Sequence, residues 1–276
     1  MTNKMNPYEK NEYTEIIKWE NEPPSVVSQT INFVMKPVTW LVGKVIPHKA
    51  IQGALIASNY LAELATDSND IKRDGEVNKI EDLRHKDLKL SDKLANEVHN
   101  WANLIASVEG AATGSAGLTG LIIDVPSLIT MSLRVIHKIG LCYGYECHTE
   151  EDKMFVYGIM SAAGANTVEE KTISVATLQT MKVCIAKNTW KKITEKASTN
   201  KYGVEVAILT IKNLAKRLGI NITKRKALQA IPIIGSGVGA AMNLAFINDI
   251  AWAARRSYQR RWLEDNDKIV VNSKAN

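Results

Sequence analysis

Histidine and cysteine side chains gather in the segment 137–148, where their chemistry suits metal binding. The four residues are His137, Cys142, Cys147 and His148. A structural zinc ion takes four nitrogen or sulfur ligands, usually from Cys-x2-4-Cys and His-x3-5-His pairs. The order His-x4-Cys-x4-Cys-His does not match this combination of pairs, because it contains no His-x3-5-His pair, and Cys142 lies within an apolar stretch. The pattern therefore favours a helix end with buried thiols, and we expect neither a metal nor another cofactor.

Motifs for phosphate binding and for nucleophilic catalysis are incomplete. The glycines at 235, 237 and 239 do not satisfy G-x-G-x-x-G, and no strand pattern precedes them. The residues around Ser115 depart from the G-x-S-x-G nucleophile elbow, because Thr113 replaces its first glycine. The sequence therefore does not indicate an enzyme, and a non-enzymatic protein is expected.

The strongest interaction signal is the segment 252–262, which reads WAARRSYQRRW. Arginines mixed with tryptophan and tyrosine suit the headgroup layer of an anionic membrane. They equally suit an acidic protein surface or RNA, or a solvated helix end whose arginines face the negative helix terminus. The predicted contact residues are Trp252, Arg255, Arg256, Tyr258, Arg260, Arg261 and Trp262.

A second candidate for membrane contact is the segment 25–49, which carries Lys36, Trp40 and Lys44. The whole chain has a formal net charge of +6, which suits an anionic partner without deciding which one. No apolar signal-peptide core opens the sequence, and three cysteines do not form a paired disulfide framework. We therefore expect a location on the cytoplasmic side of the cell membrane.

Two apolar segments, 110–144 and 227–254, contain glycines three or four residues apart. Such glycines share one helix face and let a second helix approach closely, either in lipid or in a soluble core. The first segment has too few uncharged residues for a membrane span, and Pro232 interrupts the second. We expect both to pack centrally in a soluble body, through Gly114, Gly117, Gly120, Gly235 and Gly239.

Four polar residues in or near these segments are expected to serve the polar core. Asp124 precedes Val125 and Pro126, a pattern that predicts an N-cap at the start of a new helix. Asp249 lies inside a helical pattern, where burial requires a partner from another helix. Arg134 and Asn243 complete the set, and a hydrolase built around Asp124, Arg134 and Asn243 is an alternative that requires one cleft to hold all three.

The periodicity of apolar residues predicts an all-α fold, with a single compact multi-helix domain over 25–265. Residues 1–24 are expected to form a polar helix and linker, and residues 266–276 a disordered tail. The segment 66–92 is dense in charge and contains the turn signal Asp74-Gly75, which indicates an inserted loop followed by a short polar helix. Helix is then expected from an N-cap at Ser91.

Several stretches together resemble the EcsC-like family, bacterial proteins named after a member encoded beside an ABC transporter. They are GAATGSAGLTGLIIDVP at 110–126, IGLCYGY at 139–145, EEDKMFVYGIMSAAGA at 150–165 and KALQAIPIIGSGVGAAMN at 226–243. The resemblance covers about 90–265. It implies a largely helical protein near the cytoplasmic face of the membrane, with no assigned activity, cofactor or catalytic residue.

Together these features predict a non-enzymatic, peripheral protein at the inner face of the cell membrane. Its expected partner is anionic lipid or a membrane protein, in preference to nucleic acid. The alternative is a membrane-perturbing toxin or effector whose glycine-rich hairpins insert into the bilayer. Dye leakage from vesicles would separate the two, while the oligomeric state is not indicated by the sequence.

Overall fold

The computed structural model describes residues 4–25, 55, 57, 66–113, 117–165, 167–186 and 235–270. Regular structure over these ranges is helical, with no strand, so the predicted all-α fold is confirmed. The elements are α1 (Pro7–Asn21), α5 (Asn69–Asp74), the 3-10 helix η2 (Ile80–His85), α6 (Leu88–Thr113), α7 (Gly117–Cys142), α8 (Glu150–Ala163), α9 (Val168–Ala186) and α12 (Gly235–Asp265).

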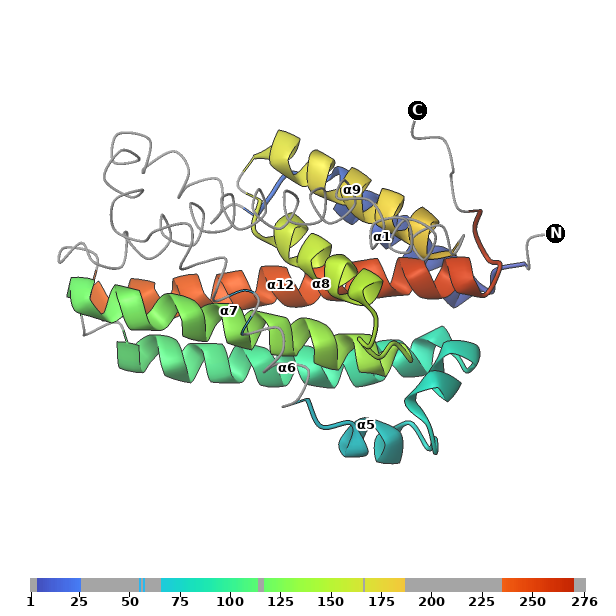
Figure 1. Ribbon diagram of the computed structural model, residues 1–276, viewed down its shortest axis with the longest axis horizontal. Coiled ribbons are helices and arrows are strands. Elements are labelled where there is room, and N and C mark those ends of the chain that lie inside the picture. Colours follow the sequence, from blue (N-terminus) through green and yellow to red (C-terminus); the bar gives the residue numbers. More distant parts are fainter. Residues whose placement is uncertain are drawn as a thin grey trace, which may run out of the picture.

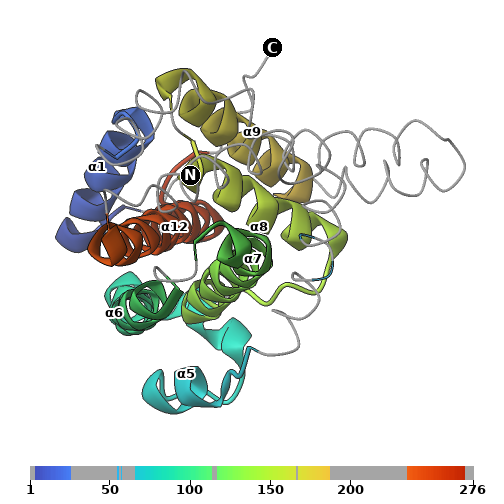
Figure 2. The same ribbon diagram turned by 90° about the vertical axis from the view of Figure 1, so that its left-hand side faces the viewer.

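Helix α12 occupies the centre of the arrangement. It packs against α6, α7, α8 and α1, while α8 also packs against α9. In Figure 1 the long helices α6, α7 and α12 run side by side, with α8, α9 and α1 on one side of them. The end-on view in Figure 2 shows α1 against α12, on the side away from α7. The residues of α12 therefore meet partners from almost every other described helix.

Helix α1 forms where the sequence predicts it, because both of its ends carry local signals. The Asn6 side chain accepts a hydrogen bond from the Glu9 amide at 2.8 Å, and the Asn6 amide donates to the Glu9 carboxylate at 2.7 Å. This reciprocal capping box satisfies two amides at the helix start. Pro23 and Pro24 follow the last turn, where a proline cannot continue a helix. Only one hydrophobic side chain of α1, Ile16, is fully buried.

The charged segment 66–92 is more structured than the predicted loop. Helices α5 and η2 lie within it, and Ile71, Ile80 and Leu83 are buried in the core. These widely spaced apolar residues fasten the segment to the body although charge dominates its composition. The predicted N-cap at Ser91 is wrong, because α6 already begins at Leu88 and Ser91 is fully buried inside it.

The expected helix start at Asp124 is also wrong. Helix α7 runs without a break from Gly117 to Cys142, so Asp124 and Pro126 both lie within it. A proline inside a helix removes one backbone hydrogen bond, here to the carbonyl of residue 122, but the remaining turns continue. The local pattern Asp-Val-Pro is typical of a helix start, but the long apolar sequences on both sides of it favour one continuous helix.

Two glycines at the end of α7 bring aromatic and backbone groups close together. A methyl group on Gly140 would lie 2.8 Å from the ring of Tyr258. Gly144 has a positive φ of 84°, and a methyl group on it would lie 2.6 Å from the backbone nitrogen of Arg84. No other residue type fits both places without displacing its neighbours. These contacts explain the Tyr-Gly-Tyr corner at 143–145, whose two tyrosines are buried.

Residues 266–270 are packed, in contrast to the predicted disordered tail. The Asn266 amide group donates to the Arg84 carbonyl at 2.8 Å, Lys268 pairs with Glu9 at 3.3 Å, and Ile269 is buried. These contacts tie the end of α12 to α1 and to η2. The remainder of that predicted tail, 271–276, lies outside the described residues.

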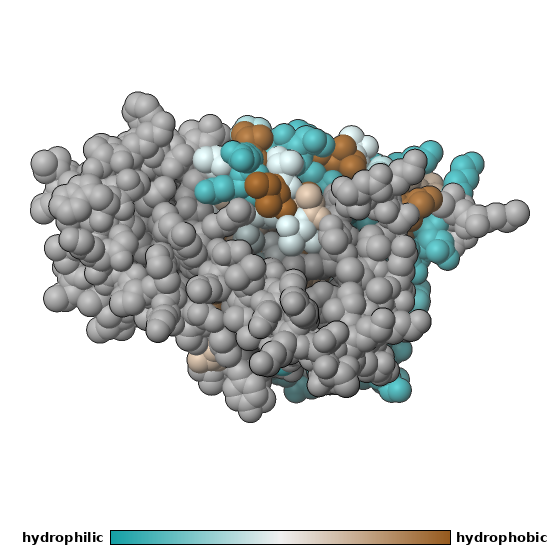
Figure 3. Space-filling view, turned by 45° about the horizontal axis from the view of Figure 1, so that its top comes forward, coloured by the Kyte–Doolittle hydropathy of each residue, from teal (hydrophilic) through white to brown (hydrophobic). Residues whose placement is uncertain are grey.

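Among the described helices, none combines the length and the apolarity that a bilayer crossing requires. The hairpin alternative involves Gly114 and residues 227–234, which lie outside the described part of the chain. In Figure 3 the hydrophobic residues on the visible described face form small islands among hydrophilic ones. This described face therefore presents no broad apolar patch.

Candidate functional site

The arginines of α12 were predicted as an exposed membrane contact, but three of them are buried. Arg255, Arg256 and Arg260 expose 9%, 8% and 7% of their surface, and the Arg261 side chain exposes 12%. We call these four residues the arginine row. Burial of a charged guanidinium requires a compensating acid or acceptor, so the partners of each arginine define the site.

Arg256 is held by carboxylates from α1. Its Nη1 donates to the Glu12 carboxylate at 2.7 Å and to the Gln259 side chain at 2.8 Å. The Glu15 carboxylate lies 3.8 Å from Nη2. The Glu12 and Arg256 side chains expose only 15% and 10%, so this ion pair is largely removed from solvent. Charge-assisted hydrogen bonds of this kind are short and strong.

Arg260 forms a second bond between the same two helices. Its Nη1 donates to both oxygens of Glu20, at 3.0 and 2.8 Å, and its Nε donates to Glu264 one turn further along α12. Glu20 exposes 12% of its side chain. With Lys268 on Glu9, three cations near the end of α12 therefore hold α1 along its whole length.

Arg261 points to the other side of α12, toward α8. It donates two hydrogen bonds to Asp152, at 3.1 and 3.2 Å, and lies over the rings of Tyr145 and Phe155. Arg255 instead donates to Asn96 of α6 and stacks on Trp252. The guanidinium groups of the row thus face three different helices, and each has an oxygen acceptor within the fold.

A buried carboxylate, Asp92 of α6, links this interface to the core. It accepts hydrogen bonds from Tyr8 of α1 at 2.7 Å, from Gln259 of α12 at 2.6 Å, and from the Tyr143 hydroxyl. Burial raises the pKa of Asp92, and the three hydrogen bonds act in the opposite direction. Burial together with Asp92 also raises the pKa of the Tyr143 hydroxyl well above its usual value.

The prediction of an exposed basic and aromatic surface at 252–262 is therefore wrong. Tyr258 and Trp262 expose 3% and 2% and belong to the core, and three of the four arginines are buried. Trp252 is half-buried, with Arg255 and Arg256 against its ring. The physical reason is that α1 supplies carboxylates to Arg256 and Arg260, while α8 supplies Asp152 to Arg261. The second predicted contact set, Lys36, Trp40 and Lys44, lies outside the described residues.

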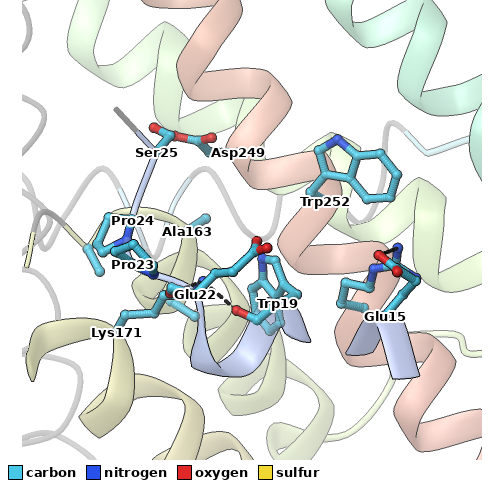
Figure 4. A pocket seen from close by; sticks show the side chains of 13 residues that line it. Glu15, Trp19, Glu22, Pro23, Pro24, Ser25, Ala163, Lys171, Asp249 and Trp252 are labelled. Atoms are coloured by element: carbon cyan, nitrogen blue, oxygen red, sulfur yellow. Dashed lines mark hydrogen bonds and ion pairs between the residues drawn. The ribbon is translucent and has the colours of Figure 1, made fainter. Parts of the chain in front are cut away.

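A cavity of about 310 Å³ opens beside the arginine row, at the end of α1. Figure 4 shows Trp19 near its middle, Trp252 and Glu15 on one side, and Ser25 with Asp249 on another. Its described wall is lined by Glu15, Trp19, Glu22, Pro23, Pro24, Ser25, Ala162, Ala163, Ala165, Lys171, Asp249, Trp252 and Arg256. Helix α1 and the residues after it supply much of this wall.

Lys171 of α9 secures the end of α1 at this cavity. Its ammonium group donates to the Trp19 carbonyl at 2.5 Å and to the Glu22 carbonyl at 2.9 Å, and it lies 4.8 Å from the Trp19 ring centre. These carbonyls belong to the last turn of α1 and the residue after it, where a cation also offsets the negative helix end. Burial lowers the pKa of Lys171, while the nearby acids raise it.

The four predicted polar residues lie in different surroundings. Asp249 is partly buried and accepts a hydrogen bond from Ser25 at 2.8 Å, so its predicted partner from another segment is found. Asn243 is buried, whereas Arg134 is exposed and lines a second cavity of about 340 Å³ between α5, α6 and α7. The described linings of the two cavities do not bring Arg134 and Asn243 together.

Several predicted packing residues have side-chain surroundings that are not described. These are Asp124 and the glycines Gly114, Gly117, Gly120, Gly235 and Gly239. For Gly114 the backbone also lies outside the described residues, whereas the other glycines lie within α7 or α12. Their central packing therefore stays a prediction.

The histidines and cysteines of 137–148 occupy the end of α7 and the turn after it. Cys142 and Cys147 are buried cysteines that form no disulfide, His137 is buried, and His148 is exposed beside Glu146. Burial raises the pKa of Cys142 and lowers the pKa of His137 to about 4. Within the described ranges no three such ligands are arranged around a common point.

The described part of the chain is therefore an all-helical protein in which other helices pack around one long helix, α12. A model of the EcsC protein family matches residues 10–263, and the chain therefore belongs to that family. It is similar to the uncharacterized protein YdbA of Bacillus subtilis (strain 168), with 25% identity over 182 residues. That alignment covers 66% of this chain and 61% of YdbA, so the chain spans less than two thirds of its relative. No solved structure matches the chain.

Proposed function

We propose that the protein is a non-enzymatic, peripheral protein at the cytoplasmic face of the membrane. Its partner would be an anionic surface, either lipid headgroups or an acidic face of a membrane protein. The observation that supports this proposal is the chemistry of the arginine row. Three of its four guanidinium groups, those of Arg256, Arg260 and Arg261, engage carboxylates at 2.7 to 3.2 Å in the folded chain, a geometry that also suits phosphate groups.

The distribution of charge along the sequence supports the same partner. Residues 187–226 contain eleven lysines and arginines and only two glutamates, and the segment 25–49 contains three lysines and no acid. Each basic residue near an anionic bilayer contributes about 1 kcal/mol to binding. A chain with this distribution is expected to bind anionic membranes and to dissociate at high salt.

Flotation of the full-length protein with lipid vesicles tests the proposal. Binding to vesicles that contain phosphatidylglycerol, with little binding to pure phosphatidylcholine vesicles, is the expected result. Replacing Lys224, Arg225 and Lys226 with glutamine should weaken this binding by about fivefold per residue that contacts the bilayer. Equal binding to both vesicle types, or none to either, would refute attraction to anionic lipid.

A second arm of the experiment separates the two possible sources of the anionic surface. If the protein binds inverted native membrane vesicles but not lipid-only vesicles, the partner is a membrane protein. If trypsin treatment of the native vesicles leaves binding intact, the partner is lipid. Failure to bind native membranes as well as lipid would contradict the proposed location.

A further inference from the structure

Helix α1 covers Arg256 and Arg260 of the arginine row. It carries four glutamates, at positions 9, 12, 15 and 20, and Glu22 follows its last residue. Two of them form the closest contacts with the arginine row: Glu12 lies 2.7 Å from Arg256, and Glu20 lies 2.8 Å from Arg260. The carboxylates of α1 therefore stand where the phosphate groups of a bound surface would stand.

Polar contacts dominate the attachment of α1. Ile16 is its one fully buried hydrophobic side chain, and Tyr8, Tyr13 and Trp19 are only partly buried. Burial of one such aliphatic side chain contributes about 1.5–3 kcal/mol. By contrast, helix α12 contributes Ile247, Ile250 and other fully buried hydrophobic residues to the core. Removing α1 would thus expose mainly charged and hydrogen-bonding groups.

The two ends of α1 are attached to the rest of the fold by polar contacts. Pro23 and Pro24 interrupt the chain directly after it, and Ser25 is fixed to α12 through its hydrogen bond to Asp249. Lys171 and Lys268 hold the two ends by hydrogen bonds and ion pairs that solvent or anions can replace. The proline pair therefore lies between a helix held by exchangeable contacts and an anchored serine.

We propose that α1 is a built-in acidic cover for Arg256 and Arg260 of the arginine row, which an anionic membrane displaces. This inference rests on the proposed function and adds its regulation. In the free protein the α1 carboxylates neutralise Arg256 and Arg260, so these two arginines cannot bind another anionic group. At an anionic surface, headgroup phosphates compete for these arginines, α1 swings out about the proline pair, and Trp252 becomes available to the headgroup layer.

Two substitutions, each of which removes one partner of the Glu20–Arg260 ion pair, test whether α1 covers these arginines. Glu20→Gln and Arg260→Gln both remove the contact between α1 and α12, so both should speed hydrogen exchange of the amides of residues 7–21 in solution. Only Glu20→Gln removes a carboxylate from an arginine, which leaves Arg260 with Glu264 as its carboxylate partner, and binding of this variant to phosphatidylglycerol vesicles should tighten about tenfold. Arg260→Gln should show no gain in binding.

A matched control removes the same charge elsewhere on the surface. Glu81 of η2 is exposed. Glu81→Gln should leave exchange in α1 unchanged and shift vesicle binding by less than about twofold, because a distant exposed charge is screened. In the wild-type protein, binding to phosphatidylglycerol vesicles should itself speed exchange of residues 7–21.

The outcomes separate this inference from the proposed function. If the wild-type protein binds anionic vesicles while α1 keeps its protection, or if Glu20→Gln binds no better than Glu81→Gln, the cover is wrong and membrane binding stands. If Glu20→Gln leaves exchange in α1 unchanged, the ion pair does not hold the helix, and the cover is again wrong. If no variant binds vesicles or native membranes, the proposed function falls and the cover with it.

Discussion

The ion pair between Glu12 and Arg256 is predicted to stabilise the fold measurably. Removing one partner of a buried pair leaves the other charge without compensation, at a cost of about 3–5 kcal/mol. Glu12→Gln should cost less, about 2 kcal/mol, because Glu15 and Gln259 remain beside Arg256. Arg256→Met should cost about 3 kcal/mol, since Glu12 then keeps only uncharged amide donors, those of Gln259 at 3.0 Å and Asn11 at 3.4 Å.

The double variant should be about as unstable as Arg256→Met alone, which gives a coupling energy of about 2 kcal/mol. Urea unfolding followed by both circular dichroism and tryptophan fluorescence measures the four proteins, and coincident transitions justify the comparison. The exposed pair of Lys18, in the last turn of α1, and Glu22, just after the helix, is the control, with 3.7 Å between the charged groups. Its coupling should stay below about 0.5 kcal/mol. A coupling for Glu12 and Arg256 no larger than the control would refute the reasoning.

Three further predictions concern the core. Gly140→Ala should destabilise the protein by about 2 kcal/mol, although alanine favours a helix, because its methyl group would lie 2.8 Å from the enclosed Tyr258 ring; an unchanged urea midpoint would contradict this. His137 has its pKa lowered to about 4 by burial, so its stabilising effect is complete above pH 6.5 and decreases by up to about 3 kcal/mol as the pH falls toward 4. A His137→Gln variant should therefore lose stability less steeply as the pH falls over this range. If the free energy of unfolding depends on pH equally in both proteins, His137 is not the group responsible. In a Cys184→Ala variant, the buried thiols Cys142 and Cys147 should resist a thiol reagent at pH 8 until urea unfolds the chain; rapid labelling of the native protein would show that they are accessible.

Local signals predicted the elements that depend on local contacts. Thr149 is a preferred N-cap residue directly before α8, and its hydroxyl accepts a hydrogen bond from the Asp152 amide at 3.1 Å. The polar helix predicted within 1–24 corresponds to α1, which ends just before two prolines. Asp124 shows the limit of such signals. Its acid-before-proline pattern is common at helix starts, but the continuous apolar periodicity of α7 determines the outcome.

The site depends on contacts that periodicity cannot reveal. The partners of Arg256 and Arg260 lie 244 and 240 residues away in the sequence. Composition and spacing near 252–262 therefore indicate an anion-binding surface but not the segment that covers it. No sequence pattern marks Asp92 or Gln259 as a site residue, because their role comes from burial between three helices. One signal was present: five glutamates at 9–22 complement the four arginines at 255–261.

The most direct test of the central claim is a distance measurement between α1 and the body of the protein. Spin labels at Thr14→Cys on α1 and Asn100→Cys on α6 occupy exposed positions, after the three native cysteines are replaced by alanine. Pulsed electron resonance should give one narrow distance in solution and with phosphatidylcholine vesicles, and a longer, broader distribution on phosphatidylglycerol vesicles. An unchanged narrow distance in the protein bound to anionic vesicles would contradict the account.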